Sequence, residues 1–237
     1  MTNCPQQFDE FAQQLHARGE NVYVPRLPRH GHADRLTPSI GEITAAEIEA
    51  AATEAAQFGR GLGTHVGVAG LSVGATMALW LAQTGAVDNA VGLAPFLMVP
   101  FAPRLPGMLL MRILDVLPNR FLWWDPRLKE RIQPPYAYPG FWTHCLAQCA
   151  FAGASIFAAA ARSKPAAPRC TIVLNAQDPA VNNAAARELA GRWQRDGAGY
   201  TLAIWDDLGK VHDVIDPSTY PGARTLVYPR LAGLLER

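Results

Sequence analysis

The chain has 237 residues, of which 49% are hydrophobic and 17% are charged, and its formal net charge is +1. This composition is typical of a globular protein with a sizeable core, and it excludes a largely disordered chain. The 21 Lys and Arg residues are scattered and are matched by 20 Asp and Glu residues, so we predict no nucleic-acid partner.

Short apolar stretches alternate with helical stretches along the first 95 residues. In chain order, the pattern predicts a helix at residues 8–18, a strand at 21–24, a helix at 43–58, a strand at 65–69, a helix at 73–84 and a strand at 89–94. Gly19 and Gly85 follow two of these helices, where glycine commonly ends a helix. This alternation is typical of an α/β fold, in which helices cover both faces of a mostly parallel sheet.

The composition changes after residue 95 and changes back near residue 169. Residues 96–168 are rich in proline and aromatic residues, and we interpret them as an insertion in a core made of residues 1–95 and 169–237. The alternation then resumes with a strand at residues 170–174, a helix at 181–195, a strand at 200–205 and a last helix at 223–235.

The sequence has four cysteines, Cys4, Cys145, Cys149 and Cys170. They are too few and too irregularly spaced for the disulfide framework of a small secreted domain, and residues 1–10 lack the basic and apolar regions of a signal peptide. The apolar run at residues 145–161 is interrupted by polar residues and is shorter than a membrane span, so we interpret it as a buried or lid helix. His144, Cys145 and Cys149 could be three ligands of a metal, but this run contains no further Cys or His to complete a set of four. We therefore predict a cytoplasmic protein with no integral membrane segment, no metal and no cofactor.

Residues 70–74 read Gly-Leu-Ser-Val-Gly, which matches the G-x-S-x-G nucleophile elbow. In this motif a strand turns sharply into a helix and presents the serine hydroxyl at the tip, and we expect the turn to leave no room for a side chain at either glycine. The predicted strand before it and helix after it provide the required context. We therefore predict that Ser72 is a nucleophile. The alternative is a glycine-rich turn with an incidental serine, and no Lys-Ser/Thr pair follows that would indicate a phosphate-binding loop.

A serine hydroxyl needs a base to remove its proton and an acid to hold that base. In proteins with this elbow the chain order is serine, acid, histidine. Four of the six histidines precede Ser72, namely His16, His30, His32 and His65. Because His144 lies in the insertion, the predicted base is His212, in the loop after the strand at residues 200–205.

Asp178 is the predicted acid. It closely follows the strand predicted at residues 170–174, and His212 follows the next strand, so both side chains are expected at one edge of the sheet. The alternative is that Asp178 only caps the helix that follows it. The remaining acids near these strand ends are Asp206 and Asp207, which are fallback candidates, and Asp213, which we interpret as a surface or turn group.

These features resemble the α/β-hydrolase superfamily, in particular its small carboxylesterase and monoacylglycerol lipase branch, over nearly the whole chain. Residues 21–32, Asn-Val-Tyr-Val-Pro-Arg-Leu-Pro-Arg-His-Gly-His, resemble a strand of that branch and its Pro-Gly-His-Gly loop, with Arg29 replacing the first glycine. Residues 212–217, His-Asp-Val-Ile-Asp-Pro, resemble its stretch around the catalytic histidine. The resemblance implies an α/β-hydrolase fold with a lid insertion.

The resemblance also implies an oxyanion hole made of two backbone N–H groups. One belongs to Val73, the residue after the nucleophile, at the start of a helix. In the family the other donor follows a His-Gly dipeptide at the end of an inner strand, and Met1 falls at that donor's position. The inner strand would lie between the strands at residues 21–24 and 65–69 but has no counterpart in the sequence. We therefore expect an N-terminally truncated form or a start at an internal methionine.

The insertion carries aromatic side chains suited to lining an acyl pocket. The candidates for substrate contact are Phe96, Phe101, Trp123, Trp124 and Trp142, and the alternative is that they form the insertion's own core. We predict a serine hydrolase that cleaves a small, uncharged carboxylic ester with a short to medium acyl chain through an acyl-serine intermediate. The alternatives are an acyltransferase, thioesterase or peptidase with the same triad, or a catalytically impaired binding protein. The oligomeric state stays open.

Overall fold

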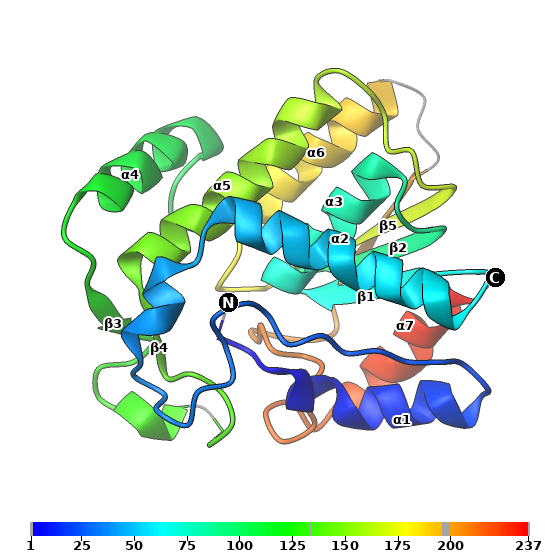
Figure 1. Ribbon diagram of the computed structural model, residues 1–237, viewed down its shortest axis with the longest axis horizontal. Coiled ribbons are helices and arrows are strands. Elements are labelled where there is room, and N and C mark those ends of the chain that lie inside the picture. The colour runs from blue at the N-terminus through cyan, green and yellow to red at the C-terminus, as the bar shows by residue number, and fades with distance from the viewer. Residues whose placement is uncertain (1, 133, 196–199, 237) are drawn as a thin grey trace.

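A computed structural model of the chain describes residues 2–132, 134–195 and 200–236 (Figure 1). Its central sheet consists of parallel strands in the order β1-β2-β5-β6, which span Gly67–Leu71, Asn89–Leu93, Arg169–Asn175 and Tyr200–Trp205. β2 is buried along its whole length and β5 at all but its first residue, as expected of inner strands that helices cover on both faces. The predicted mostly parallel α/β fold is therefore confirmed.

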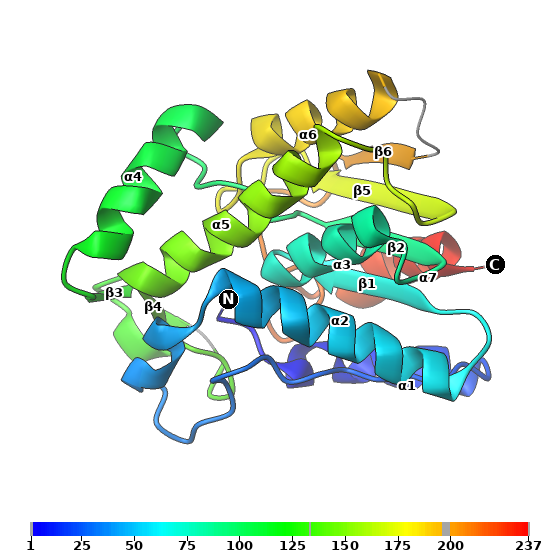
Figure 2. The ribbon, with the colours of Figure 1, turned by 45° about the horizontal axis from the view of Figure 1, so that its top comes forward.

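Helices cover both faces of this sheet (Figures 1 and 2). On one face α3 (Val73–Thr84) packs against β1 and β2, and α2 (Ala45–Leu62), α5 (Thr143–Ala160) and α6 (Asn183–Arg195) surround it. On the other face lie α1 (Asp9–Ala17) and α7 (Tyr228–Leu235), and their Phe11 and Tyr228 rings lie 5.1 Å apart. Shorter helical turns occur at Pro5–Phe8, Pro38–Glu42, Lys129–Ile132 and Ala223–Val227.

Most predicted elements are present, and their ends shift by a few residues. The helix at residues 73–84 and the strand at residues 200–205 match in full. The prediction of a strand at residues 21–24 was wrong, because this stretch belongs to no strand of the described sheet. Figure 1 shows it running alongside β1; both stretches line one cavity, and among the described residues no backbone hydrogen bond joins them.

Residues 96–168 include α4 (Arg104–Val116), the antiparallel pair β3 (Phe121–Trp123) and β4 (Gly140–Trp142), and α5. Figure 1 shows α4 and the β3–β4 pair beside the sheet, and α4 packs mainly on α5. α5 also packs on α2 and α3. It is the one described helix that is long and apolar enough to cross a membrane, and 61% of it is buried, as in a core helix.

Candidate active site

Ser72 lies at the sharp turn between β1 and α3. Its backbone has φ 59° and ψ −117°, a conformation that residues other than glycine rarely adopt. Three backbone hydrogen bonds hold it there: the Ser72 N–H donates to Leu93 O at 3.0 Å, and the Ser72 carbonyl accepts from Thr76 N at 3.0 Å and Phe96 N at 3.1 Å. A serine held in a strained turn is a sign of functional constraint.

The two glycines that flank this turn differ in their surroundings. A Cβ atom at Gly70 would lie 2.1 Å from the carbonyl oxygen of Gly74, so no side chain fits at residue 70. A Cβ atom at Gly74 would meet nothing within 4 Å. The expectation that the turn excludes a side chain at both glycines is thus wrong for Gly74, because its Cβ would point away from the crossing of strand and helix.

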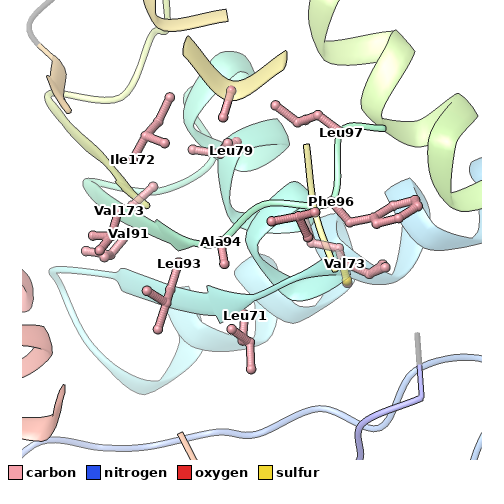
Figure 3. Packing of buried hydrophobic residues seen from close by; sticks show 14 of the residues in the cluster. Leu71, Val73, Leu79, Val91, Leu93, Ala94, Phe96, Leu97, Ile172 and Val173 are labelled. Atoms are coloured by element: carbon pink, nitrogen blue, oxygen red, sulfur yellow. The ribbon is translucent and has the colours of Figure 1, made fainter. Parts of the chain in front are cut away.

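Buried apolar side chains pack around the elbow (Figure 3). Leu71 and Val73, on either side of the serine, are 6% and 2% exposed, and both belong to the main hydrophobic core. Figure 3 shows Val73 close to Phe96, which is 5% exposed. Since this core is contributed by the sheet and α3 together, the turn is fixed by the packing of the whole fold.

His212 and Asp178 are in direct contact. The Nδ1 atom of His212 lies 2.8 Å from Asp178 Oδ2. The Asp178 side chain is completely buried, whereas the His212 ring is 21% exposed. The other Asp178 oxygen, Oδ1, accepts a hydrogen bond from Ala180 N at 2.8 Å. That turn precedes the start of α6 at Asn183, so Asp178 contacts the histidine and a local turn rather than the helix end.

The fallback acids make other contacts. Asp207 pairs with Arg230, with 2.8 Å between Arg230 Nη1 and Asp207 Oδ1. This hydrogen bond with the guanidinium lowers the pKa of Asp207. Asp206 is exposed, and no hydrogen bond joins its carboxylate to His212 in the described part of the chain. Of the three candidates, Asp178 is the one that reaches the imidazole.

Asn175 holds the loop that carries His212, and the sequence analysis missed this residue. It is the last residue of β5 and is 1% exposed. Its Nδ2 atom donates to the carbonyl oxygens of Gly209 at 2.9 Å and Val211 at 2.6 Å. A polar residue at the end of an otherwise apolar strand was the available signal, since a buried amide requires partners.

Asp213 is buried, so its interpretation as a surface group was wrong, whereas the turn alternative fits its Oδ1 atom, which accepts a hydrogen bond from Asp216 N at 3.4 Å. It is 8% exposed, and its Oδ2 atom accepts hydrogen bonds from Gln7 Nε2 and from Asn3 Nδ2, the latter at 3.4 Å. Burial, with a further contribution from the charge of Asp216, raises the pKa of Asp213 to about 6. The residue was misjudged because its partners at the N-terminus are far away in the sequence. The hydrogen bonds from Gln7 and Asn3 fix the loop directly after His212.

Two features of the elbow bear on its chemistry. The N–H of Val73 is at the first position of α3, where helical amides have no intrahelical partner, and it donates to no other described residue. Ser72 is 9% exposed, and no hydrogen bond joins its hydroxyl to His212 among the residues that the structure describes. Such contacts are often long before substrate binds. Met1, predicted as the second oxyanion donor, lies outside the described residues.

The five aromatic residues predicted to contact substrate have different surroundings. Phe96 belongs to the core at 5% exposure, whereas Phe101 is 75% exposed. Trp123 and Trp142 both pack edge-on against Phe121. Trp124 is 39% exposed, and its Nε1 atom donates to Thr2 Oγ1 at 3.2 Å. Thus the structure brings only part of this set together.

The described residues contain no cluster of three or more His, Cys, Asp or Glu side chains that could hold a metal ion. At this edge of the sheet the imidazole of His212 is the group able to accept a proton.

Comparisons with known proteins agree with the fold. The sequence pattern of the family described as "Alpha/beta hydrolase family" matches residues 5–223. Among curated proteins, no sequence matches the chain significantly.

Solved structures give matches at the level of the fold. The structure reported with LipS and LipT, two metagenome-derived lipolytic enzymes, is 18% identical with a TM-score of 0.71, over 99% of this chain and 89% of that one. The monoacylglycerol lipase of Paleococcus ferrophilus is 17% identical with a TM-score of 0.71, over 99% and 91% of the two chains. A thioesterase domain from the curacin biosynthetic pathway is 12% identical with a TM-score of 0.59, over 99% and 88%.

Proposed function

Since the chain belongs to the alpha/beta hydrolase family, we propose that it is a serine hydrolase that cleaves carboxylic esters with Ser72, His212 and Asp178. The contact that carries this proposal is the 2.8 Å hydrogen bond between His212 Nδ1 and the buried carboxylate of Asp178. With the proton of the neutral ring held on Nδ1, the other ring nitrogen, Nε2, is the free base.

The reaction proceeds in two halves. In the first, Ser72 Oγ attacks the ester carbonyl carbon while His212 Nε2 takes the hydroxyl proton. The C–O bond to the alcohol then breaks, the alcohol leaves with the proton from His212, and the acyl group stays on Ser72. In the second half, water attacks the acyl carbon and gives its proton to His212, which returns it to Ser72 Oγ as the carboxylic acid leaves. Asp178 stays ionised and stabilises the imidazolium.

The oxyanion of each tetrahedral intermediate needs hydrogen-bond donors. The Val73 N–H suits this role because it is adjacent to the nucleophile, has no partner among the described residues and lies at the positive end of the α3 dipole. We keep Met1 as the proposed position of the second donor.

We further propose that residues 96–168 form a cap that accommodates the acyl chain. Several apolar side chains of α4 are exposed, including Leu105 at 70%, Leu109 at 61% and Val116 at 81%. An uncharged ester with a short to medium acyl chain matches this apolar character. Initial rates on p-nitrophenyl acetate, butyrate, octanoate and palmitate would define the preferred acyl length.

Labelling with a fluorophosphonate tests the mechanism, because only an activated serine reacts quickly with this probe. We expect labelling and ester hydrolysis by the unchanged chain and neither by Ser72→Ala. Ser39→Ala is the matched control, since the Ser39 hydroxyl makes no hydrogen bond with another described residue. Full hydrolysis by Ser72→Ala would overturn the assignment. Faster turnover of thioesters or aminoacyl substrates, or acyl transfer to added alcohols, would keep the triad but change the reaction.

A further inference from the structure

Two neighbouring tyrosines at residues 134–138 join the insertion to the core by hydrogen bonds. Tyr138 Oη accepts from the Gly31 N–H at 2.9 Å. Tyr136 Oη donates to Asp216 Oδ2 at 2.7 Å. The loop of Gly31 carries none of the three proposed catalytic residues, whereas Asp216 lies four positions after the proposed base. The two tyrosines are therefore alike in chemistry and differ in the loop that each contacts.

Asp216 is a buried acid that closes a turn. It is 3% exposed. Its Oδ1 atom accepts from Ser218 N at 2.9 Å and from Ser218 Oγ at 2.7 Å. Its carbonyl oxygen accepts from Thr219 N at 3.0 Å and from Tyr220 N at 2.8 Å. None of these contacts involves Oδ2, and buried polar atoms are nearly always paired. The Tyr136 hydroxyl is the donor to this oxygen among the described residues.

The residues between His212 and Asp216 are packed in the core. Val214 is 1% exposed and Ile215 is 0% exposed. The Asp216 N–H donates to Asp213 Oδ1 at 3.4 Å, and Asp213 is adjacent to His212. Closely packed side chains cannot shift independently of one another. A displacement of Asp216 is therefore transmitted along this stretch to the imidazole.

His212 thus lies between two anchors of its loop. On one side, Asn175 donates to two carbonyl oxygens of the loop. On the other side, Tyr136 donates to Asp216 and lies 2.9 Å from Ser218 Oγ. In the described part of the chain, no other residue of the insertion makes a hydrogen bond with this loop or with the turn that follows it. The insertion and the proposed base are therefore linked at one hydroxyl group.

We propose that Tyr136 is a positioning residue for the reaction of Ser72 and His212. Through Asp216, its hydroxyl holds the second half of the loop, so that the imidazole stays where it can take the serine proton. This role rests on the proposed function, since it concerns the same base. It gives the insertion a second task besides accommodating the acyl chain, because the contact between insertion and core sets the position of His212. Small misplacements of a catalytic group are enough to slow a reaction.

Tyr136→Phe removes the hydroxyl and keeps the ring, and Tyr138→Phe is the matched control. We expect kcat for p-nitrophenyl butyrate to fall about 10-fold in Tyr136→Phe, with KM changed by less than about twofold, because the base is misplaced while the substrate contacts remain. Tyr138→Phe also removes a hydrogen bond between insertion and core, but it should keep kcat within about twofold of the original. An unchanged kcat in Tyr136→Phe, an equal loss in both variants, or a rise in KM alone would overturn the proposal.

A double-mutant cycle shows whether Tyr136 acts through Asp216. Asp216→Asn alone should lower kcat by about 10-fold or more, and adding Tyr136→Phe to it should lower kcat by less than about twofold further. Losses that multiply in the double variant would mean that the hydroxyl acts by another route, which contradicts the proposal.

Hydrogen exchange provides a readout that needs no ester. The amides of Thr219 and Tyr220 donate to the Asp216 carbonyl, so they report how firmly the turn is held. We expect them to exchange about 10-fold faster in Tyr136→Phe than in the unchanged chain, and at the original rate in Tyr138→Phe. Unchanged exchange in Tyr136→Phe would overturn the proposal even if activity fell. A chain that hydrolyses no ester and reacts with no fluorophosphonate would instead refute the proposed function, and the exchange rates would still decide whether Tyr136 holds this turn.

Discussion

His212 Nδ1 lies 2.8 Å from Asp178 Oδ2, although 34 positions separate the two residues in the sequence. Their loops follow β6 and β5, which are hydrogen-bonded neighbours in register from Cys170–Tyr200 to Asn175–Trp205. Because parallel strands end at a common edge, the loops after them meet there. The contact thus follows from the topology of the sheet, and Ser72 follows β1 at the same edge.

Asp178→Asn should reduce kcat for an ester substrate by a factor on the order of 10⁴. An amide in place of the carboxylate favours the wrong imidazole tautomer and cannot stabilise the imidazolium. Fluorophosphonate labelling should slow in parallel. Asp206→Asn, at the end of the neighbouring strand, is the control and should keep full activity. A variant of Asp178 with more than a tenth of the original kcat would contradict the triad.

The two elbow glycines should respond differently to alanine. Gly70→Ala places a Cβ atom 2.1 Å from the carbonyl oxygen of Gly74. The backbone of Gly74 can move away from this Cβ only if the elbow is distorted. We expect a loss of about 3 kcal/mol in the free energy of unfolding, or no folded protein. Gly74→Ala meets open space in a helix, so a gain of up to about 1 kcal/mol is expected. Urea denaturation of both variants measures the contrast, and equal effects would refute it.

The fold was largely predictable because its signals are local. The helix at residues 73–84 ends at Gly85, which adopts φ 73°, and its strand neighbours are short apolar runs bounded by turns. The stretch at residues 21–24 has the same local pattern, yet it is not a strand. A strand requires a partner at hydrogen-bonding distance, and the local sequence of residues 21–24 does not show whether such a partner exists.

The candidate site was predictable to the extent that chain order and strand ends define it. Asp178 and His212 could be paired because they follow neighbouring strands. The roles of Asn175 and Asp213 could not be predicted, because they depend on burial and on distant partners such as Gln7. The separate environments of Phe96 and Phe101 likewise depend on packing that composition does not encode.

Asn175→Ala should lower activity, although Asn175 acts on the loop that carries His212 and not on the substrate. The substitution removes both hydrogen bonds to the carbonyls of Gly209 and Val211, so the loop that carries His212 becomes free to move. We expect kcat to fall by about 10- to 100-fold with KM little changed, since small misplacements of a catalytic group have effects of this size. Gln177→Ala, whose side chain makes only a 3.4 Å contact with the Asp206 carbonyl, is the control. An unchanged kcat would show that the loop is held by other contacts.

Asp213 should make the stability of the protein depend on pH between about 4 and 7. Burial raises its pKa from 3.8 to about 6, so in this range the folded chain binds more protons at this residue than the unfolded chain does. Its contribution to stability is therefore complete below pH 4 and is lost as the pH rises through 6, by up to about 3 kcal/mol.

Asp213→Asn cannot titrate, so the difference in unfolding free energy between the original chain and this variant isolates the effect. Urea denaturation at pH 4, 5, 6 and 7 should show the original chain losing stability relative to the variant at each step. Asp207→Asn is the control of opposite sign. Arg230 lowers the pKa of Asp207, so its contribution is constant above pH 5 and is lost only at lower pH. A flat difference for Asp213→Asn across the whole range would mean that its carboxyl group titrates alike in the folded and unfolded chains.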